Sequence, residues 1–146
     1  MQRAHKKVEP IYPLEQWAIV EEQFRTEHNL RNETVFSLGN GYLGLRGTFE
    51  EGYAGPEGTS VEGTYINGFY DTVELKYPEV AHGYPEKSQT MLNLTNGKLI
   101  KLYLEDEECH LFSGEVLTYR RTLDLKNGVL QRNLIWRSPA GREIDF

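Results

Sequence analysis

Apolar and polar residues alternate along much of the second half of the chain. The pattern is clearest in residues 116–125, where Leu117, Tyr119, Leu123 and Leu125 share one face and Thr118, Arg120, Thr122 and Asp124 share the other. A period of two predicts β-strands. Similar alternation predicts further strands within residues 88–94, 100–104, 129–137 and 143–146, with turns at residues 96–97, 105–108, 127–128 and 138–141.

The first part of the chain gives a weaker pattern. Residues 1–13 contain Pro10 and Pro13 and are predicted to be an irregular lead-in. Residues 14–24 carry Trp17, Ile19 and Val20, which favour a strand, although the Glu and Gln residues among them also allow a helix. We favour the strand here. Two polar stretches, residues 26–32 and 71–87, are predicted to be connections.

Residues 32–51 form the stretch around which we expect the chain to be organised. Its apolar runs, residues 35–38 and 42–46, flank Gly39-Asn40-Gly41, which predicts a tight hairpin at the centre of the sheet. The glycines here reduce bulk where the backbone turns or where another segment approaches closely. Arg46 and the Glu50/Glu51 pair add charge at the far end, which we expect to face something outside the chain.

A glycine-rich loop is predicted in residues 51–63, and loops of this length are usually functional or mobile. The aromatic run in residues 64–70 follows, with Asn67-Gly68 as either a bulge or a turn. The whole pattern predicts an all-β fold, an antiparallel β-sandwich occupying residues 1–146 as a single domain. Because the alternation is still in progress at Phe146, we expect the sandwich to be incomplete at its C-terminal edge and the chain to be the N-terminal fragment of a longer enzyme.

Composition restricts the class of partner. The formal net charge of -6 argues against nucleic acid and anionic membranes, which attract basic patches. No apolar run approaches the ~20 residues that a spanning helix requires. The single cysteine, Cys109, excludes a disulfide framework, and we expect a cytoplasmic location.

Several motifs in the sequence have simpler explanations than a functional site. Residues 39–44 satisfy G-x-G-x-x-G, but Gly47 interrupts the helix that a dinucleotide site needs at this point. The four histidines lack metal-ligand spacing, so no metal site is predicted. A pair of carboxylates for glycoside chemistry could come from Glu50/Glu51 or from Asp71 with Glu74. On a strand, Glu50 and Glu51 would point to opposite faces, and salt bridges to Arg46 are the favoured alternative.

Tyrosine and phenylalanine side chains gather near the glycine-rich loop, and aromatic faces beside Asn or Arg suit sugar rings. The candidates for contact with a carbohydrate or with another domain are Arg46, Glu50, Tyr65, Asn67 and Tyr70. Packing in the core and between domains is the alternative explanation for these aromatic residues.

The sequence resembles the N-terminal domain of glycoside hydrolase family 65, which includes maltose, trehalose and kojibiose phosphorylases. Three runs carry the resemblance: ETVFSLGNGYLGLRGTFEEG (33–52), GTYINGFYD (63–71) and QTMLNLTNGKLIKLYLEDE (89–107). In that family the domain precedes an (α/α)6 barrel and a small C-terminal β domain. The resemblance implies a non-catalytic domain that supports its own barrel and a homodimer.

The resemblance also implies an activity for the complete protein. This is the inverting phosphorolysis of an α-linked glucose disaccharide to β-glucose 1-phosphate, with inorganic phosphate as co-substrate and no cofactor. The family's catalytic residues lie in the barrel, so no catalytic residue is assigned here. Two alternatives remain open: a free-standing carbohydrate-binding module, and a structural or interaction domain of a related glycoside hydrolase.

Overall fold

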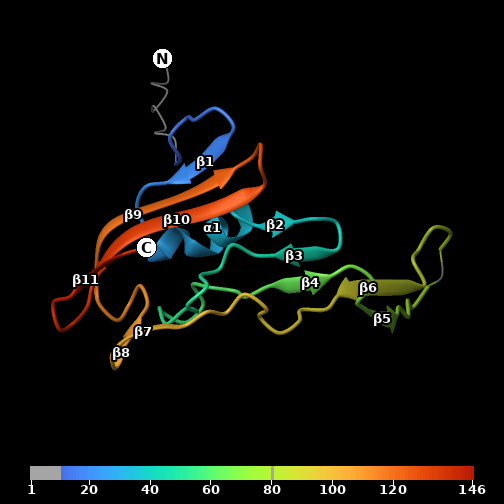
Figure 1. Ribbon diagram of the computed structural model, residues 1–146. Helices are drawn as coiled ribbons and strands as arrows, with labels where there is room; N and C mark the ends of the chain where they lie inside the picture. The colour runs from blue at the N-terminus through green and yellow to red at the C-terminus, as the bar shows by residue number, and fades with distance from the viewer. Residues whose placement is uncertain (1–10, 80) are drawn as a thin grey trace, which may run out of the picture.

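Antiparallel strands make up most of the regular secondary structure in this computed structural model, which describes residues 11–79 and 81–146 (Figure 1). Most of the predicted lead-in, residues 1–10, lies outside the described residues. The main sheet has the order β1 (Ala18–Glu21), β9 (Glu115–Asp124), β10 (Val129–Arg137) and β11 (Glu143–Asp145). All neighbouring strands in it are antiparallel, as expected from their alternating sequences and the tight turn between β9 and β10. The all-β expectation is confirmed.

The hydrophobic core lies on one face of the main sheet. Tyr119 of β9 is directly opposite Leu134 of β10, and both side chains are buried, together with Trp136. They pack against Phe49, Cys109 and Leu111, which come from segments outside the sheet. The second layer of the core is therefore built from the end of strand β8 (Glu107–Cys109) and from connecting segments, among them the 46–51 segment that carries Phe49.

A short helix lies beside the main sheet, where the sequence predicted a polar connection in residues 26–32. The 3-10 helix η1 (Thr26–His28) leads directly into α1 (Asn29–Val35). The expectation for this stretch was wrong because the buried residues of α1 are polar. Asn29, Asn32 and Glu33 are its inward-facing side chains, so the helix lacks an apolar stripe.

The predicted hairpin is confirmed, but it begins later than expected and lies in a separate three-stranded ribbon, not at the centre of the main sheet. β2 (Leu38–Gly39) pairs with β3 (Leu43–Leu45), which also pairs with β4 (Thr64–Ile66). Val35, at the start of the first apolar run, is instead the last residue of α1. Residues 39–44 thus lie in a hairpin, not in a strand-to-helix turn. Asn67-Gly68 forms a turn, in which Phe69 N donates to Ile66 O.

The ribbon of β2, β3 and β4 extends away from the main sheet and leads to β5 and β6 at its far end (Figure 1). β5 (Tyr70–Glu74) pairs with β6 (Lys87–Met91), so the expectation of a connection throughout residues 71–87 was wrong. All residues of both strands are exposed. Without a buried face there is no alternation to detect in the sequence.

The remaining segments agree with the prediction in part. All of residues 51–63 are described and none belongs to a helix or a strand, as expected for the glycine-rich loop. The strand predicted in residues 88–94 ends at Met91, and the one in residues 100–104 is β7 (Leu102–Leu104). The predicted acidic turn is shorter, because Glu107 begins β8 (Glu107–Cys109).

Candidate functional site

The 46–51 segment is held in place by cationic side chains from distant parts of the chain. The ammonium group of Lys98 donates to Arg46 O at 2.9 Å and also to Thr48 O. Arg121 Nη1 donates to the intervening Gly47 O at 2.7 Å. These donors take the place of a neighbouring strand, which explains how a buried backbone segment avoids unpaired carbonyl groups.

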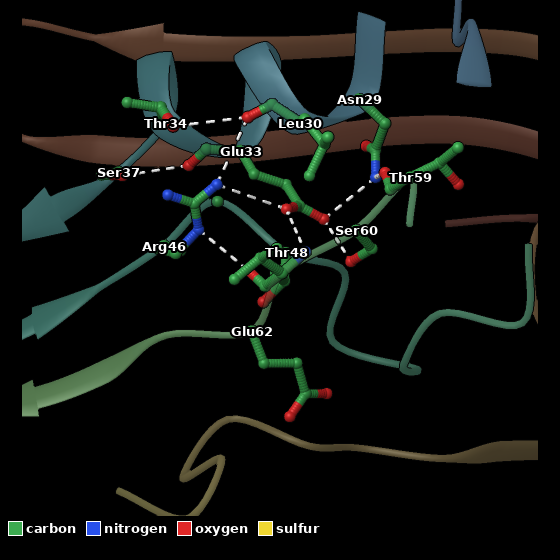
Figure 2. A network of polar contacts seen from close by, with 12 residues as sticks. Asn29, Leu30, Glu33, Thr34, Ser37, Arg46, Thr48, Thr59, Ser60 and Glu62 are labelled. Atoms are coloured by element: carbon green, nitrogen blue, oxygen red, sulfur yellow. Dashed lines mark hydrogen bonds and ion pairs between the residues drawn. The ribbon is translucent and has the colours of Figure 1, made fainter. Parts of the chain in front are cut away.

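A buried carboxylate attaches helix α1 to the glycine-rich loop (Figure 2). Glu33 is completely buried. Its Oε1 accepts hydrogen bonds from Asn29 Nδ2, at 2.9 Å, and from the Ser60 hydroxyl group. Its Oε2 accepts one from Val61 N, also at 2.9 Å. Glu33 therefore fixes residues 60–61 of the loop relative to α1.

Arg46, one of the predicted site residues, belongs to this same network (Figure 2). Its Nε donates to Val61 O at 2.8 Å, and its Nη2 donates to Leu30 O at 3.3 Å. The Nη2 atom also lies 3.5 Å from Glu33 Oε2. The Arg46 side chain is thus turned toward α1 and the loop, and its charge is partnered within the chain.

Glu50, another predicted site residue, shares a cationic partner with Glu51. Arg132 lies 3.3 Å from Glu50 Oε2 and makes a two-point contact with the Glu51 carboxylate. The expectation of salt bridges to Arg46 was wrong. Both carboxylates can reach Arg132 because residues 50–51 form a turn, so the alternation rule for strands does not apply.

Burial and neighbouring charge change the pKa values of the two cations beside this turn. Burial would lower the pKa of Arg132, but the hydrogen bond and charge of Glu51, together with Glu50, raise it above its ordinary value. Burial lowers the pKa of Lys98, and the negative charge of Glu50 opposes that change. The site is therefore a network of compensated charges.

A second buried network joins the main sheet to α1. Arg121 Nε donates to Glu21 Oε2 at 2.9 Å, and the Tyr119 hydroxyl group donates to the same oxygen at 3.0 Å. Asn32 of α1 donates to the other oxygen of Glu21. Burial raises the pKa of Tyr119, so this side chain remains a neutral donor. The guanidinium group of Arg121 also lies over the ring of Phe36, 4.4 Å from its centroid.

The other three predicted residues lie on the ribbon. Tyr65 belongs to β4, Tyr70 begins β5, and Asn67 is in the turn between these strands. The Tyr70 hydroxyl group donates to Asn67 Oδ1 at 2.8 Å. Among the hydrogen bonds and ion pairs of the described residues, none joins these three side chains directly to Arg46 or Glu50. Arg46 and Tyr65 nevertheless both flank Gly63, where an added Cβ would lie 2.5 Å from Arg46 Cδ and 2.7 Å from Tyr65 Cε2.

Sequence reasoning missed the residues that organise the centre, namely Glu33, Lys98, Arg121 and Arg132. A signal was available for two of them. Arg121 lies two positions from Tyr119, and Arg132 lies two positions from Leu134. Residues two positions apart on a strand share a face, which predicts that both arginines point toward the core. In the part of the chain that the structure describes, no helix is long and apolar enough to cross a membrane, and no cluster of His, Cys, Asp or Glu is arranged to hold a metal ion.

The fold and the two networks together define an antiparallel β domain organised around a central segment that charged side chains hold in place. Residues 19–146 match the family model described as glycosyl hydrolase family 65, N-terminal domain. The chain belongs to this family, as its N-terminal domain.

Characterised relatives and a solved structure agree with this assignment. The chain is 51% identical over 142 residues to an α,α-trehalose phosphorylase of Thermoanaerobacter brockii, covering 97% of this chain and 18% of the relative. It is 39% identical to an α,α-trehalose phosphorylase of Geobacillus stearothermophilus, covering 88% and 17%. The solved structure of a putative kojibiose phosphorylase from the human microbiome superposes with a TM-score of 0.70 at 34% identity, covering 86% of this chain and 16% of that one. The chain thus spans less than a fifth of the length of these relatives.

Proposed function

We propose that this chain is the N-terminal supporting domain of an enzyme that cleaves α,α-trehalose with inorganic phosphate. The products are β-glucose 1-phosphate and glucose. The observation that carries the proposal is the 51% identity to a trehalose phosphorylase, compared with 34–35% for kojibiose and maltose phosphorylases.

The catalytic groups belong, in this proposal, to the barrel domain of the complete protein. Inversion requires a general acid that protonates the leaving glucosyl oxygen, while phosphate attacks the anomeric carbon from the opposite side. Phosphate is already anionic, so this attack does not require the second carboxylate that activates water in a hydrolase. The contribution of this chain is structural. Its compensated buried charges support a role in fixing loops, because the carboxylates of Glu33 and Glu51 are already occupied by partners within the chain.

We further propose a homodimer and a cytoplasmic location for the complete protein. The single cysteine supports the location, because proteins exposed to oxidising compartments commonly use disulfides.

Incubation of the full-length protein with trehalose, maltose or kojibiose tests the activity. Proton NMR distinguishes β-glucose 1-phosphate from its α anomer and from free glucose. We expect phosphate-dependent formation of the β anomer, fastest with trehalose. Cleavage that proceeds equally without phosphate would indicate a hydrolase, and faster turnover of kojibiose or maltose would refute the substrate assignment.

A further inference from the structure

A shallow groove of about 280 Å³ lies on one face of the ribbon. Its floor includes Gly39 of β2 and Gly44 of β3, which are direct cross-strand partners. Tyr42, Tyr65 and Met91 form much of its wall, with Asn67 beside them. The Tyr42 side chain is 66% exposed. The groove is thus a strip of bare backbone bordered by large side chains.

The glycines in residues 39–47 differ in the structural reason for having glycine at each position. Gly41 has a φ of +85°, which the hairpin turn demands, and a Cβ on Gly47 would lie 2.8 Å from Phe36. Neither reason applies to Gly44. Its φ is not left-handed, and an added Cβ would meet nothing within 4 Å. The nearest atom to a Cβ on Gly39 would be at 3.6 Å, an ordinary contact.

Glycine in a strand is unfavourable unless something approaches the backbone closely. This chain supplies no such neighbour at Gly44. We propose that the groove is a docking surface for polypeptide from the remainder of the same protein, with an apolar side chain of that polypeptide seated on the Gly39–Gly44 pair.

The chemistry of the groove favours polypeptide over sugar. A sugar ring presents hydroxyl groups all round its edge, which need several donors and acceptors. Apart from the hydroxyl groups of Tyr42 and Tyr65, the lining has one polar side chain, Asn67, and its Oδ1 already accepts a hydrogen bond from Tyr70. Tyrosine and methionine, which flank the floor, are enriched where protein surfaces meet.

The length of the relatives favours the same polypeptide over a second copy. This chain covers 16–18% of the proteins that it matches, so most of a complete member lies outside it. Covalent attachment gives a neighbouring domain an effective concentration in the millimolar range for a short linker, far above that of a separate copy. The inference rests on the proposed function in one respect, the presence of a following domain.

Photochemical cross-linking in the full-length protein tests the proposal. Tyr42 is replaced by p-benzoylphenylalanine, with Lys126→p-benzoylphenylalanine, at the exposed turn before β10, as the control. After irradiation, mass spectrometry identifies the linked peptides. We expect the Tyr42 probe to join a peptide that follows Phe146 within one polypeptide, in higher yield than the Lys126 probe. A link between two copies, or a yield no higher than the control, overturns the proposal.

A pair of glycine substitutions gives a second readout. Gly44→Leu places a side chain on the floor of the groove, whereas Gly97→Leu does so at another glycine with open space around it. We expect Gly44→Leu to remove the Tyr42 cross-link and Gly97→Leu to retain it. Retention in both variants refutes docking on the glycine pair. Phosphorolysis by the unmodified protein is measured separately, so an inactive protein that still forms the cross-link would refute the proposed activity and leave the docking surface standing.

Discussion

The guanidinium group of Arg121 donates a hydrogen bond of 2.7 Å to the main-chain carbonyl oxygen of Gly47, 74 positions earlier in the chain. The same side chain forms a buried ion pair with Glu21, in which Nη2 and Oε2 are 2.8 Å apart. Arg121 therefore connects β1, β9 and the 46–51 segment. Its loss would leave both a carboxylate and a carbonyl group buried without their charged partner.

Replacing Arg121 with methionine is expected to weaken the domain strongly. Removing one partner of a buried ion pair costs about 3–5 kcal/mol, because the remaining charge stays desolvated. Hydrogen exchange of the β9 amides, converted to a free energy of opening, measures the loss in the full-length protein.

The neighbouring Arg120→Met is the matched control for that experiment. Arg120 lies on the opposite face of the same strand and pairs with Glu15 and Glu22, but its side chain is 45% exposed. Exposed ion pairs contribute about 0–1 kcal/mol. Equal losses in the two variants would show that Arg121 does not act through its buried pair.

Glu33→Gln should loosen the glycine-rich loop while leaving the main sheet in place. The substitution keeps the shape of the side chain but removes the charge that Val61 N, Ser60 and Arg46 share. Hydrogen bonds to a charged group contribute about 1.5–3 kcal/mol. Faster proteolytic cleavage within residues 53–63 is the expected result. Glu57→Gln, at an exposed position of the same loop, should leave the cleavage rate unchanged.

Gly47→Ala is expected to destabilise the domain by about 1–3 kcal/mol, the usual cost of overpacking. The new methyl group would lie 2.8 Å from both the Cβ and the carbonyl oxygen of Phe36, and the oxygen belongs to the backbone and cannot rotate away. A shift in the thermal unfolding temperature measures the effect. Gly97→Ala, where the methyl group meets open space, should cause little change, and an equal shift there would contradict the steric explanation.

The pH dependence of stability should report the burial of Lys98. Burial lowers its pKa below 10.5 in the folded protein, so the folded state loses this proton at a lower pH than the unfolded chain. Between these two pKa values the unfolded chain binds more protons, and stability therefore rises with pH. Relative to a Lys98→Met variant, the wild type should gain free energy of unfolding as the pH approaches 10.5. A relative loss over that range would reverse the sign and refute the assignment.

Sequence patterns located the strands that have one buried face. β9 and β10 were predicted to within a residue or so because their alternation reflects the core directly. The Asn127-Gly128 turn followed from its own conformational preference, and Gly128 has the expected left-handed φ of 65°.

The same reasoning failed where burial is polar or absent. α1 turns Asn29, Asn32 and Glu33 inward, and these residues resemble an exposed connection to any method that looks for apolar periodicity. β5 has no buried residue and was read as part of a connection, whereas most of β6, which is equally exposed, fell inside the strand predicted in residues 88–94. The partners of Arg121 and Arg132 could not be found because they lie far away in the sequence.

The cations that hold the 46–51 segment have a consequence for biosynthesis. Lys98 is synthesised 50 residues after Thr48, Arg121 74 residues after Gly47, and Arg132 81 residues after Glu51. A nascent chain that has emerged only as far as the hairpin therefore lacks every one of these three cations. The segment can therefore acquire all of these partners only after the ribosome has delivered β10, so it matures later than its place in the chain suggests.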